Sequence, residues 1–342
     1  MRKRIGERTL LFRSEPRIRS AAAIVAGNEG KGAFSGTFDT VLEDDTFGED
    51  SFEKAECKMF QTAALLACQK AGLAPCDVQA MLAGDLLNQL ITANYAAREL
   101  GVPFLGLYGA CSTIAESLLL GGVLSDGGFC SPVLCCASSH FSTAERQYRF
   151  PLEMGTTAPP TAQRTVTGAG ALLLSAQDVP LPVFSHVALT GATIGRVIDL
   201  GITDMNNMGA AMAPACCDTI LAHLRDTGSD VRDYDLIVSG DLGSFGSEML
   251  TDLAHKNGLM LTGRYLDCGA SIYRKEQGFP CGGSGAGCSA VVLAAELLDR
   301  IERGGVNRML FLATGALMSP TSGMQGESSP GIAHAVVLER RD

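Results

Sequence analysis

The sequence predicts an α/β protein made of two similar halves, each containing β-α-β units. Apolar runs of strand length alternate with helical patterns along most of the 342 residues. The order of these elements also repeats. Each half has a strand ending in Gly-Asp, a strand that leads through a Cys-Ser turn into a helix, and two further strands. We place the halves at 1–180 and 181–342, with residues 138–165 as a cap on the first.

Composition indicates a globular chain and excludes several classes of protein. Hydrophobic residues make up 46% of the chain and charged residues 19%, which excludes a disordered protein. The net charge of −10 argues against nucleic-acid binding, because that function needs a basic surface. A basic cluster lies between Arg2 and Arg19, and we expect a solvated arm there. Contact with a membrane surface or an anionic partner is the alternative.

No segment has the features of a signal peptide or a membrane span. The basic start is not followed by an apolar stretch, and no run reaches the ~18 apolar residues of a spanning helix. Without an export signal, the twelve cysteines are expected to be reduced and mostly buried. They form no Cys-x-x-Cys motif, and the five histidines have no ligand spacing, so we expect neither a metal nor a cofactor.

The N-terminal half is predicted to contain five strands and three helices. The helix at 51–71 follows from apolar residues on one face, such as Phe52, Met59 and Ala63, and from Gly72 as its C-cap. Gly101 ends the second helix. The expected strands are 21–27, 78–83, 102–108, 133–137 and 168–175, and the expected helices are 51–71, 92–100 and 114–125.

The C-terminal half repeats this arrangement. The expected strands are 187–193, 236–239, 309–313 and 332–339, and the expected helices are 208–225 and 288–303. Pro214 is expected to kink or begin the first of these helices. A glycine-rich turn at 282–287 precedes the second.

The two halves can be aligned through their cysteines. Residues 109–112 (Gly-Ala-Cys-Ser) correspond to residues 286–289 (Ala-Gly-Cys-Ser), and the same offset carries 133–137 onto 310–314 without a gap. Chance similarity between two α/β segments is the alternative to an internal duplication.

The turn around Cys111 is the first candidate site. Gly109 and Ala110 allow a sharp turn, and Ser112 and Thr113 are suited to begin a helix. Cys111 would then lie beside unpaired backbone N–H groups at the positive end of a helix dipole. Such a position favours a thiolate and also binds anions. The residues alone leave open whether Cys111 attacks a substrate or helps to hold one.

Two similar halves with a cysteine at a strand-to-helix turn resemble the thiolase fold, and in particular enzymes of the 3-oxoacyl-ACP synthase III type. Their nucleophile motif, Gly-Ala-Cys-Ser/Ala, is similar to residues 109–112, and their glycine-rich strand is similar to 167–171. The resemblance implies α-β-α-β-α layers. In those enzymes a histidine and an asparagine assist the cysteine. The corresponding stretches here, 238–242 and 282–285, contain neither residue, which argues against ordinary condensing chemistry.

A narrower resemblance is to the stage V sporulation protein AD (SpoVAD) family. It is carried by residues 82–89, 92–95, 138–140, 143–147, 165–168, 199–204 and 313–316. It implies a thiolase-fold sporulation protein that binds dipicolinic acid (pyridine-2,6-dicarboxylate), with or without calcium, for uptake into the developing spore. It also implies a homodimer, peripheral on the cytoplasmic side of the forespore or spore inner membrane, beside membrane-embedded channel proteins.

Two other functions remain open at this point. The first is an acyltransferase or 3-oxoacyl synthase-type condensing enzyme that uses Cys111, with His140 or His334 as an unusual base. The second is a scaffold subunit whose fold serves assembly alone.

The resemblance and the motifs give a set of candidate ligand-binding residues. Cys111 stands at a vestigial nucleophile position. The expected ligand-binding residues are Cys111, Ser112, Asn88, His140, Arg146, Ser284 and His334.

Several of these residues have an alternative role. His140, with Arg146 and Arg149, could receive an anion, but Arg146 could equally pair with Glu145 in a solvated cap. His334 could be a core histidine. Asp85 and Asp241, in matching turns, are expected mainly to cap those turns, although organising the pocket or binding Ca²⁺ is the alternative.

Overall fold

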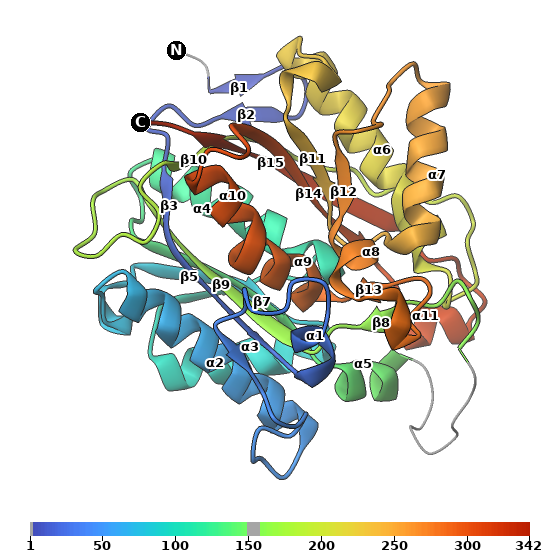
Figure 1. Ribbon diagram of the computed structural model, residues 1–342, viewed down its shortest axis with the longest axis horizontal. Coiled ribbons are helices and arrows are strands. Elements are labelled where there is room, and N and C mark those ends of the chain that lie inside the picture. Colours follow the sequence, from blue (N-terminus) through green and yellow to red (C-terminus); the bar gives the residue numbers. More distant parts are fainter. Residues whose placement is uncertain (1–2, 149–157) are drawn as a thin grey trace.

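Ten strands form a continuous path through the computed structural model, which describes residues 3–148 and 158–342 (Figure 1). Their order is β12-β11-β14-β15-β10-β3-β9-β7-β5-β6. In the N-terminal half these are β3 (Arg17–Val25), β5 (Ala80–Gly84), β6 (Phe104–Gly106), β7 (Val133–Ser139) and β9 (Gly168–Ser175). In the C-terminal half they are β10 (Val187–Thr193), β11 (Leu236–Ser239), β12 (Tyr265–Asp267), β14 (Arg308–Ala316) and β15 (Gly331–Arg340).

The strand order reveals the duplication directly. From the outer edge inward, the N-terminal half reads β6-β5-β7-β9-β3 and the C-terminal half reads β12-β11-β14-β15-β10. In each half the first two pairings are parallel and the next two are antiparallel. The two sets of strands meet through one residue pair, Ala188 with Arg17. The predicted fold of two duplicated halves is therefore confirmed.

Helices form three layers around these strands (Figure 1). The outer layer of the N-terminal half holds α2 (Phe52–Lys70) and α3 (Ile91–Leu100). The outer layer of the other half holds α6 (Met208–Thr227) and α7 (Gly243–Lys256). Between the two halves lie α4 (Thr113–Asp126) and α9 (Ala286–Val292), which continues through a π-helical turn at Leu293–Leu297 into α10 (Leu298–Glu302). The largest apolar core surrounds α4 and α9.

Short elements complete the fold. Three short strands extend the main sheet: β1 (Arg4–Ile5), β2 (Thr9–Leu11) and β4 (Thr40–Val41). A separate pair joins β8 (Arg164–Thr165) to β13 (Gly283–Ser284). The remaining α-helices in the described ranges are α1 (Gly27–Gly30), α5 (Phe141–Tyr148), α8 (Cys268–Ile272) and α11 (Pro320–Met324).

Several predicted elements match and others differ for physical reasons. Strands β9 and β10 have the predicted bounds, and Ser51 caps α2 by accepting from the Lys54 N–H at 3.3 Å. Helix α6 begins at Met208 and continues past Pro214 to Thr227, so the expected start at Pro214 is wrong. The expected helix at 288–303 begins two residues earlier and contains the π-helical turn. Helix α7 was not predicted.

The predicted cap segment, 138–165, is more regular than expected at both ends. Strand β7 extends to Ser139 and is followed by α5, and β8 lies at the other end. The middle of the segment, 149–157, lies outside the described residues.

The basic N-terminal cluster is docked on the fold. The β1–β2 hairpin pairs with β10, so the expected solvated arm is wrong for this part of the chain. Four of its described cations have acceptors elsewhere on the protein. Lys3 pairs with Asp126 at 2.9 Å, Arg8 with Asp218 at 2.8 Å and Arg19 with Asp178 at 2.7 Å, and Arg17 donates to the carbonyls of Arg341 and Asp342.

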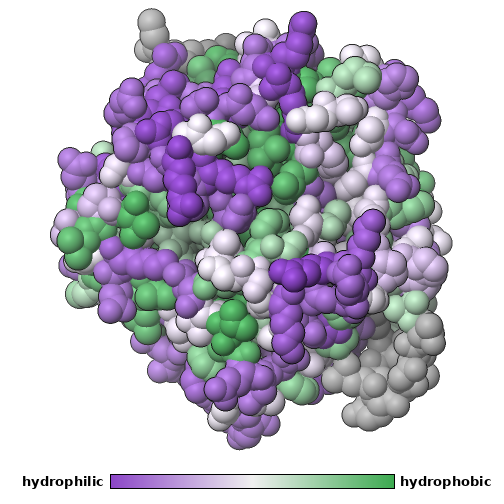
Figure 2. Space-filling view, viewed as in Figure 1, coloured by the Kyte–Doolittle hydropathy of each residue, from purple (hydrophilic) through white to green (hydrophobic). Residues whose placement is uncertain are grey.

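The visible surface is mostly hydrophilic (Figure 2), and most of the cysteines are buried. The face in Figure 2 is largely hydrophilic, with apolar residues in separate small groups. In the described ranges, no helix combines the length and apolar character needed to cross a membrane. All twelve cysteines are free thiols. Cys76 is exposed, Cys57 and Cys130 are half-buried, and the others are buried.

Candidate functional site

The turn at Cys111 has the strand-to-helix geometry that the sequence predicts. Ala110 has a φ of +50°, a left-handed conformation that is uncommon for a residue with a side chain and is typical of functional turns. The following residues form a 3₁₀ turn at Ala110–Ser112 that leads into α4. From the other half, Gly315 of β14 lies so close that a Cβ there would be 2.4 Å from the Gly109 carbonyl oxygen. The turn is therefore held at the junction of the two halves.

The Cys111 thiol contacts a buried carboxyl group from the opposite half. Asp241, which follows β11, is fully buried and lies close enough to this thiol to raise the thiol's pKa. Its Oδ1 accepts from the Thr314 hydroxyl at 2.8 Å, and its Oδ2 accepts from the Gly285 N–H at 2.9 Å. Two donors, one from β14 and one from the turn before α9, thus hold this carboxyl group beside the Cys111 turn.

This environment keeps the thiol protonated. Burial raises the pKa of Cys111 well above its ordinary value, and the adjacent Asp241 raises it further. Burial also raises the pKa of Asp241, to about 7. The expectation that the helix start would stabilise a Cys111 thiolate is therefore wrong, because desolvation and a neighbouring carboxyl group outweigh the helix dipole.

Substituting Asp241 tests this electrostatic account. We expect Asp241→Asn to lower the pH midpoint of Cys111 alkylation by iodoacetamide, because the nearest negative charge is removed. Peptide mass spectrometry across a pH series would follow each thiol separately, with the exposed Cys76 as the internal control. An unchanged midpoint would show that Asp241 does not set the protonation of Cys111.

A small cavity lies directly against Cys111. Its lining includes Tyr108, Tyr148, Thr165, Ser284 and Met318, and no lysine or arginine is among the described residues that surround it. The elements that build it, α5, β8, β13 and the chain before α11, gather at the lower right of Figure 1. Its volume of about 30 Å³ is the room of about one water molecule. A larger ligand can enter only when side chains move.

A second compartment adjoins the first on the outer side. It has a volume of about 270 Å³ and shares Tyr108, Tyr148 and Met318 with the inner cavity. Asn88 and Ser319 line this compartment and not the inner cavity. The two tyrosine hydroxyl groups are 2.9 Å apart, and both side chains therefore lie between the two compartments.

The structure brings only some of the predicted ligand-binding residues together. Cys111 and Ser284 line the inner cavity, and Asn88 lines the outer compartment. Ser112 is next to Cys111 in the chain, but its buried hydroxyl donates to the Gly109 carbonyl at 2.7 Å, and it does not line the cavity.

The two predicted histidines lie elsewhere. His140 is buried, its Nε2 lies 2.7 Å from the Asp45 carbonyl oxygen, and its Nδ1 accepts from the Ser142 N–H at 3.1 Å. His334 Nδ1 accepts from the Gly195 N–H at 3.1 Å. Burial lowers the pKa of both imidazoles, to about 4 for His334. Neither lines the Cys111 cavity, so neither is placed to act as its base.

Arg146, expected beside His140, does not line the cavity either. Arg146 pairs with Glu53 of α2 and is half exposed. Arg149 lies outside the described residues.

Asp85 and Asp241, which occupy matching turns in the two halves, have different roles in the structure. Asp85 accepts from the backbone N–H groups of Leu87 and Ala93, both at 2.8 Å, and thus caps the turn before α3. Glu56 of α2 lies near Asp85 and is fully buried; its carboxyl oxygens accept from the Ser138 and Thr143 hydroxyls at 2.9 and 3.0 Å. Asp85 therefore has the structural role that the sequence favours, whereas Asp241 reaches the candidate site.

Sequence reasoning missed three residues of the site. The sequence predicts Asp241 mainly as a turn cap, although it stands where the resembling synthases have their histidine. Tyr108 directly precedes the Cys111 motif, and this position was a usable signal. Nothing in the sequence around Tyr148 indicates that it belongs to the site, because its contact with Tyr108 depends on how α5 packs.

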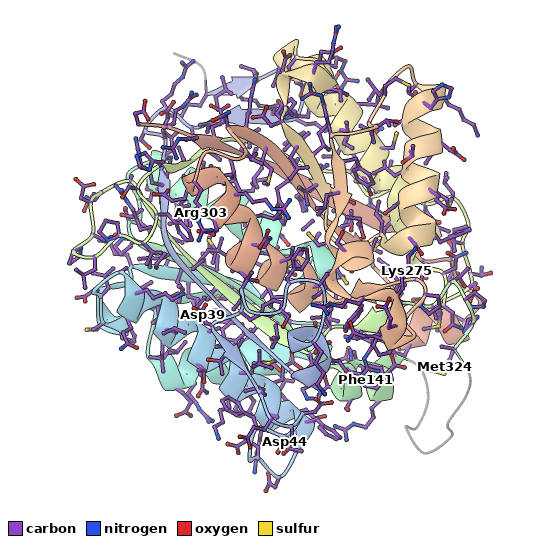
Figure 3. All side chains as sticks on the ribbon, in the orientation of Figure 1. Asp39, Asp44, Phe141, Lys275, Arg303 and Met324 are labelled. Atoms are coloured by element: carbon purple, nitrogen blue, oxygen red, sulfur yellow. The ribbon has the colours of Figure 1, made fainter. Side chains whose placement is uncertain are left out.

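Two other pockets are larger, but several of the charged residues that line them are already paired with each other or with neighbours. A groove of about 630 Å³ between α2 and α3 is lined by charged residues such as Lys54 and Arg98, which pair with Asp50 and Glu99. Asp39 and Arg303, labelled in Figure 3, line another hollow of about 550 Å³. Their charges are also paired, with Lys70 and Asp299. Within the described ranges, no group of three or more His, Cys, Asp and Glu residues could hold a metal ion.

Comparison with known proteins places this geometry in context. The model of the family described as stage V sporulation protein AD (SpoVAD) matches residues 6–339. The chain is 43% identical over 338 residues to stage V sporulation protein AD of Bacillus subtilis (strain 168), covering 99% of this chain and 98% of that protein.

Solved structures show the same fold at much lower identity. 3-Oxoacyl-[acyl-carrier-protein] synthase III from Aquifex aeolicus VF5 has a TM-score of 0.57 at 14% identity, covering 95% of this chain and 99% of that one. Acetamide-bound OleA from Xanthomonas campestris has a TM-score of 0.62 at 14% identity, with coverage of 96% and 100%. Human mitochondrial 3-ketoacyl-CoA thiolase in complex with CoA has a TM-score of 0.57 at 14% identity, with coverage of 96% and 98%. The fold is thus that of thiolases and 3-oxoacyl synthases.

Proposed function

Because the chain belongs to the stage V sporulation protein AD family, we propose that this thiolase-like sporulation protein binds dipicolinate without transforming it. In this proposal the ligand lies in the cavity at Cys111, and binding there serves its uptake into the developing spore.

The contact between Cys111 and Asp241 is the observation that supports binding over catalysis. A condensing enzyme needs a reactive thiolate and hydrogen-bond donors for the oxyanion that forms. Here the thiol lies beside a carboxyl group that raises its pKa, and that carboxyl group already accepts from Thr314 and Gly285. A protonated thiol in this setting can line a pocket, but it is a weak nucleophile.

The lining of the cavity favours a neutral form of the ligand. Hydroxyl groups of Ser284, Thr165 and the two tyrosines surround it, and the carboxyl groups of Glu145 and Asp241 are close by. Burying a free dianion there without a cation would be costly. A 1:1 chelate of Ca²⁺ with pyridine-2,6-dicarboxylate has no net charge, and we therefore propose this chelate as the preferred ligand.

Calorimetric titration tests the proposal. We expect saturable binding of dipicolinate, tighter by about tenfold, or about 1.4 kcal/mol, when equimolar calcium is present. Ser284→Leu should weaken binding by more than that factor, because its side chain fills the inner cavity. Ser244→Leu is the matched control, since Ser244 is exposed and lies outside the cavity.

The contrary outcomes are distinct. Absence of saturable binding with either form of the ligand would refute the proposal. A stable thioester on Cys111 after incubation with acyl-CoA, detected by mass spectrometry, would instead support the acyltransferase alternative. Asp241 would then be the base, because it contacts the thiol and the two histidines do not line the cavity.

Assembly and location are part of the same proposal. Following the family resemblance, we propose a homodimer that is peripheral at the inner membrane of the forespore or spore and hands its ligand to membrane-embedded partners. Light scattering of the purified protein would test the dimer, and co-purification with the membrane fraction would test the location.

A further inference from the structure

Two tyrosines, Tyr108 and Tyr148, line both the outer compartment and the cavity at Cys111. Tyr108 comes from the chain just before the Cys111 turn, and Tyr148 is the last residue of α5. Their hydroxyl groups lie 2.9 Å apart, so the contact joins two separate elements across the entrance. Tyr108 is 45% exposed, whereas Cys111 behind it is 5% exposed.

Further hydrogen bonds hold this contact in place. The Tyr148 hydroxyl donates to the Leu86 carbonyl, and the Gln147 side-chain amide donates to the same carbonyl at 2.9 Å. The Gln147 side-chain oxygen accepts from the Asn88 N–H at 2.9 Å. The end of α5 is thus fastened to the loop that follows β5, and the Tyr148 ring is held at the entrance.

The outer compartment presents polar groups that are available to a ligand. Asn88 and Gln89 line it, and neither side-chain amide has a hydrogen-bond partner among the residues that the structure describes. Gln89 and Leu90 have φ angles of +56° and +55°, so two successive residues adopt a left-handed conformation. Such backbone strain is found where side chains are held for a ligand. Amide N–H groups are suitable donors for carboxylate oxygens.

We propose that the site has two compartments in series. The outer compartment first receives a planar aromatic acid or its neutral metal chelate through Asn88 and Gln89. The Tyr108–Tyr148 contact must then open before the ring reaches Cys111. This inference rests on the proposed function for the identity of the ligand, but the closure by the tyrosines is independent of it.

Labelling of Cys111 tests the closure without any ligand. Methyl methanethiosulfonate is a small, uncharged thiol reagent, and peptide mass spectrometry resolves the labelled sites. We expect Tyr148→Phe to accelerate labelling of Cys111 by about tenfold, because that variant loses the bonds to Tyr108 and Leu86. Tyr108→Phe should have a smaller effect in the same direction, because it loses one bond.

Two controls make the labelling result specific. Tyr95→Phe alters an exposed tyrosine of α3 that lines neither compartment and should leave Cys111 labelling unchanged. Cys76 should be labelled at the same rate in every variant. Equal Cys111 rates in the wild type and both entrance variants would refute the closure. Equal melting temperatures would show that the variants remain folded.

A kinetic experiment tests the outer compartment. In stopped-flow binding of calcium dipicolinate, Asn88→Ala should slow association by several-fold, because the ligand loses its first contact. Asn28→Ala, outside both compartments, should not. Unchanged association in Asn88→Ala would refute the role of the outer compartment. If calcium dipicolinate fails to bind the wild type, the proposed function and this ligand assignment both fail, and labelling alone then decides the closure.

Discussion

The free energy of unfolding is expected to fall as the pH rises from about 6.5 to about 8, because buried carboxyl groups lose their protons in this range. Burial raises the pKa of Glu29 and of Asp241 to about 7. Burial, reinforced by the neighbouring Asp85, raises the pKa of Glu56 to about 8. An ordinary glutamate in the unfolded chain titrates near pH 4.3. The native state therefore binds more protons than the unfolded state until the native pKa is passed.

The sign and the range follow from this difference. A raised carboxyl pKa gives stability that is fully present below the unfolded pKa and is lost as the pH rises through the folded pKa. Each such group contributes up to about 1.4 kcal/mol per pH unit. The buried histidines act in the opposite sense at lower pH. The pKa values of His223 and His334 are lowered to about 4, so their effect ends near pH 6.5.

Glu56→Gln is the variant that isolates one group. We expect it to reduce the slope of unfolding free energy against pH between about 6.5 and 8 by up to about 1.4 kcal/mol per unit. Urea denaturation at a series of pH values would measure that slope. Glu99→Gln, on the exposed side of α3, is the matched control and should leave it unchanged. A Glu56→Gln slope equal to that of the wild type would contradict the prediction.

Adding one methyl group at Gly170 is expected to destabilise the protein by about 3 kcal/mol, at the upper end for overpacking. Gly170 lies in β9, between β3 and β7, and faces the central helix α9. A Cβ atom there would be 2.6 Å from the backbone carbon and oxygen of Ala290. Backbone atoms cannot move aside as a flexible side chain can, so the helix and the strand would have to separate.

The measurement compares two glycine-to-alanine variants. Chemical denaturation of Gly170→Ala should show the loss, together with a lower melting temperature. Gly27→Ala is the control, because a Cβ there would meet only the Leu42 carbonyl oxygen, at 3.9 Å. Its stability should stay within about 1 kcal/mol of the wild type. Equal stability of the two variants would show that the contact between β9 and α9 is looser than the structure indicates.

Much of the fold could be predicted because its signals are local. The helical spacing of apolar residues predicts α2, and two apolar runs predict β9 and β10 with their observed first and last residues. Helix α7 was missed because it begins with Gly-Ser-Phe-Gly-Ser, a run of low helical propensity that is compensated by packing against α6. The prediction of a helix start at Pro214 is wrong for a similar reason, since tertiary packing sustains α6 on both sides of it.

The site was harder to predict because its key contacts join distant residues. Cys111 was identified from its turn, but its contact with Asp241 depends on how the two halves meet. His140 and His334 have the residue type expected of a ligand-binding group, yet backbone groups hold both imidazoles. Such backbone contacts leave no trace in the local sequence.

The burial of the cysteines has a consequence for chemical durability. Oxidation by peroxide begins with a thiolate that solvent can reach. Of the twelve thiols, only Cys76 is exposed, and burial raises the pKa of Cys135 and Cys136 inside β7. Oxidative damage should therefore begin at Cys76, away from the cavity at Cys111, and spare the interior until the fold opens. Although the chain has twelve cysteines, we therefore expect it to be oxidised slowly, because burial keeps most of the thiols protonated and out of contact with solvent.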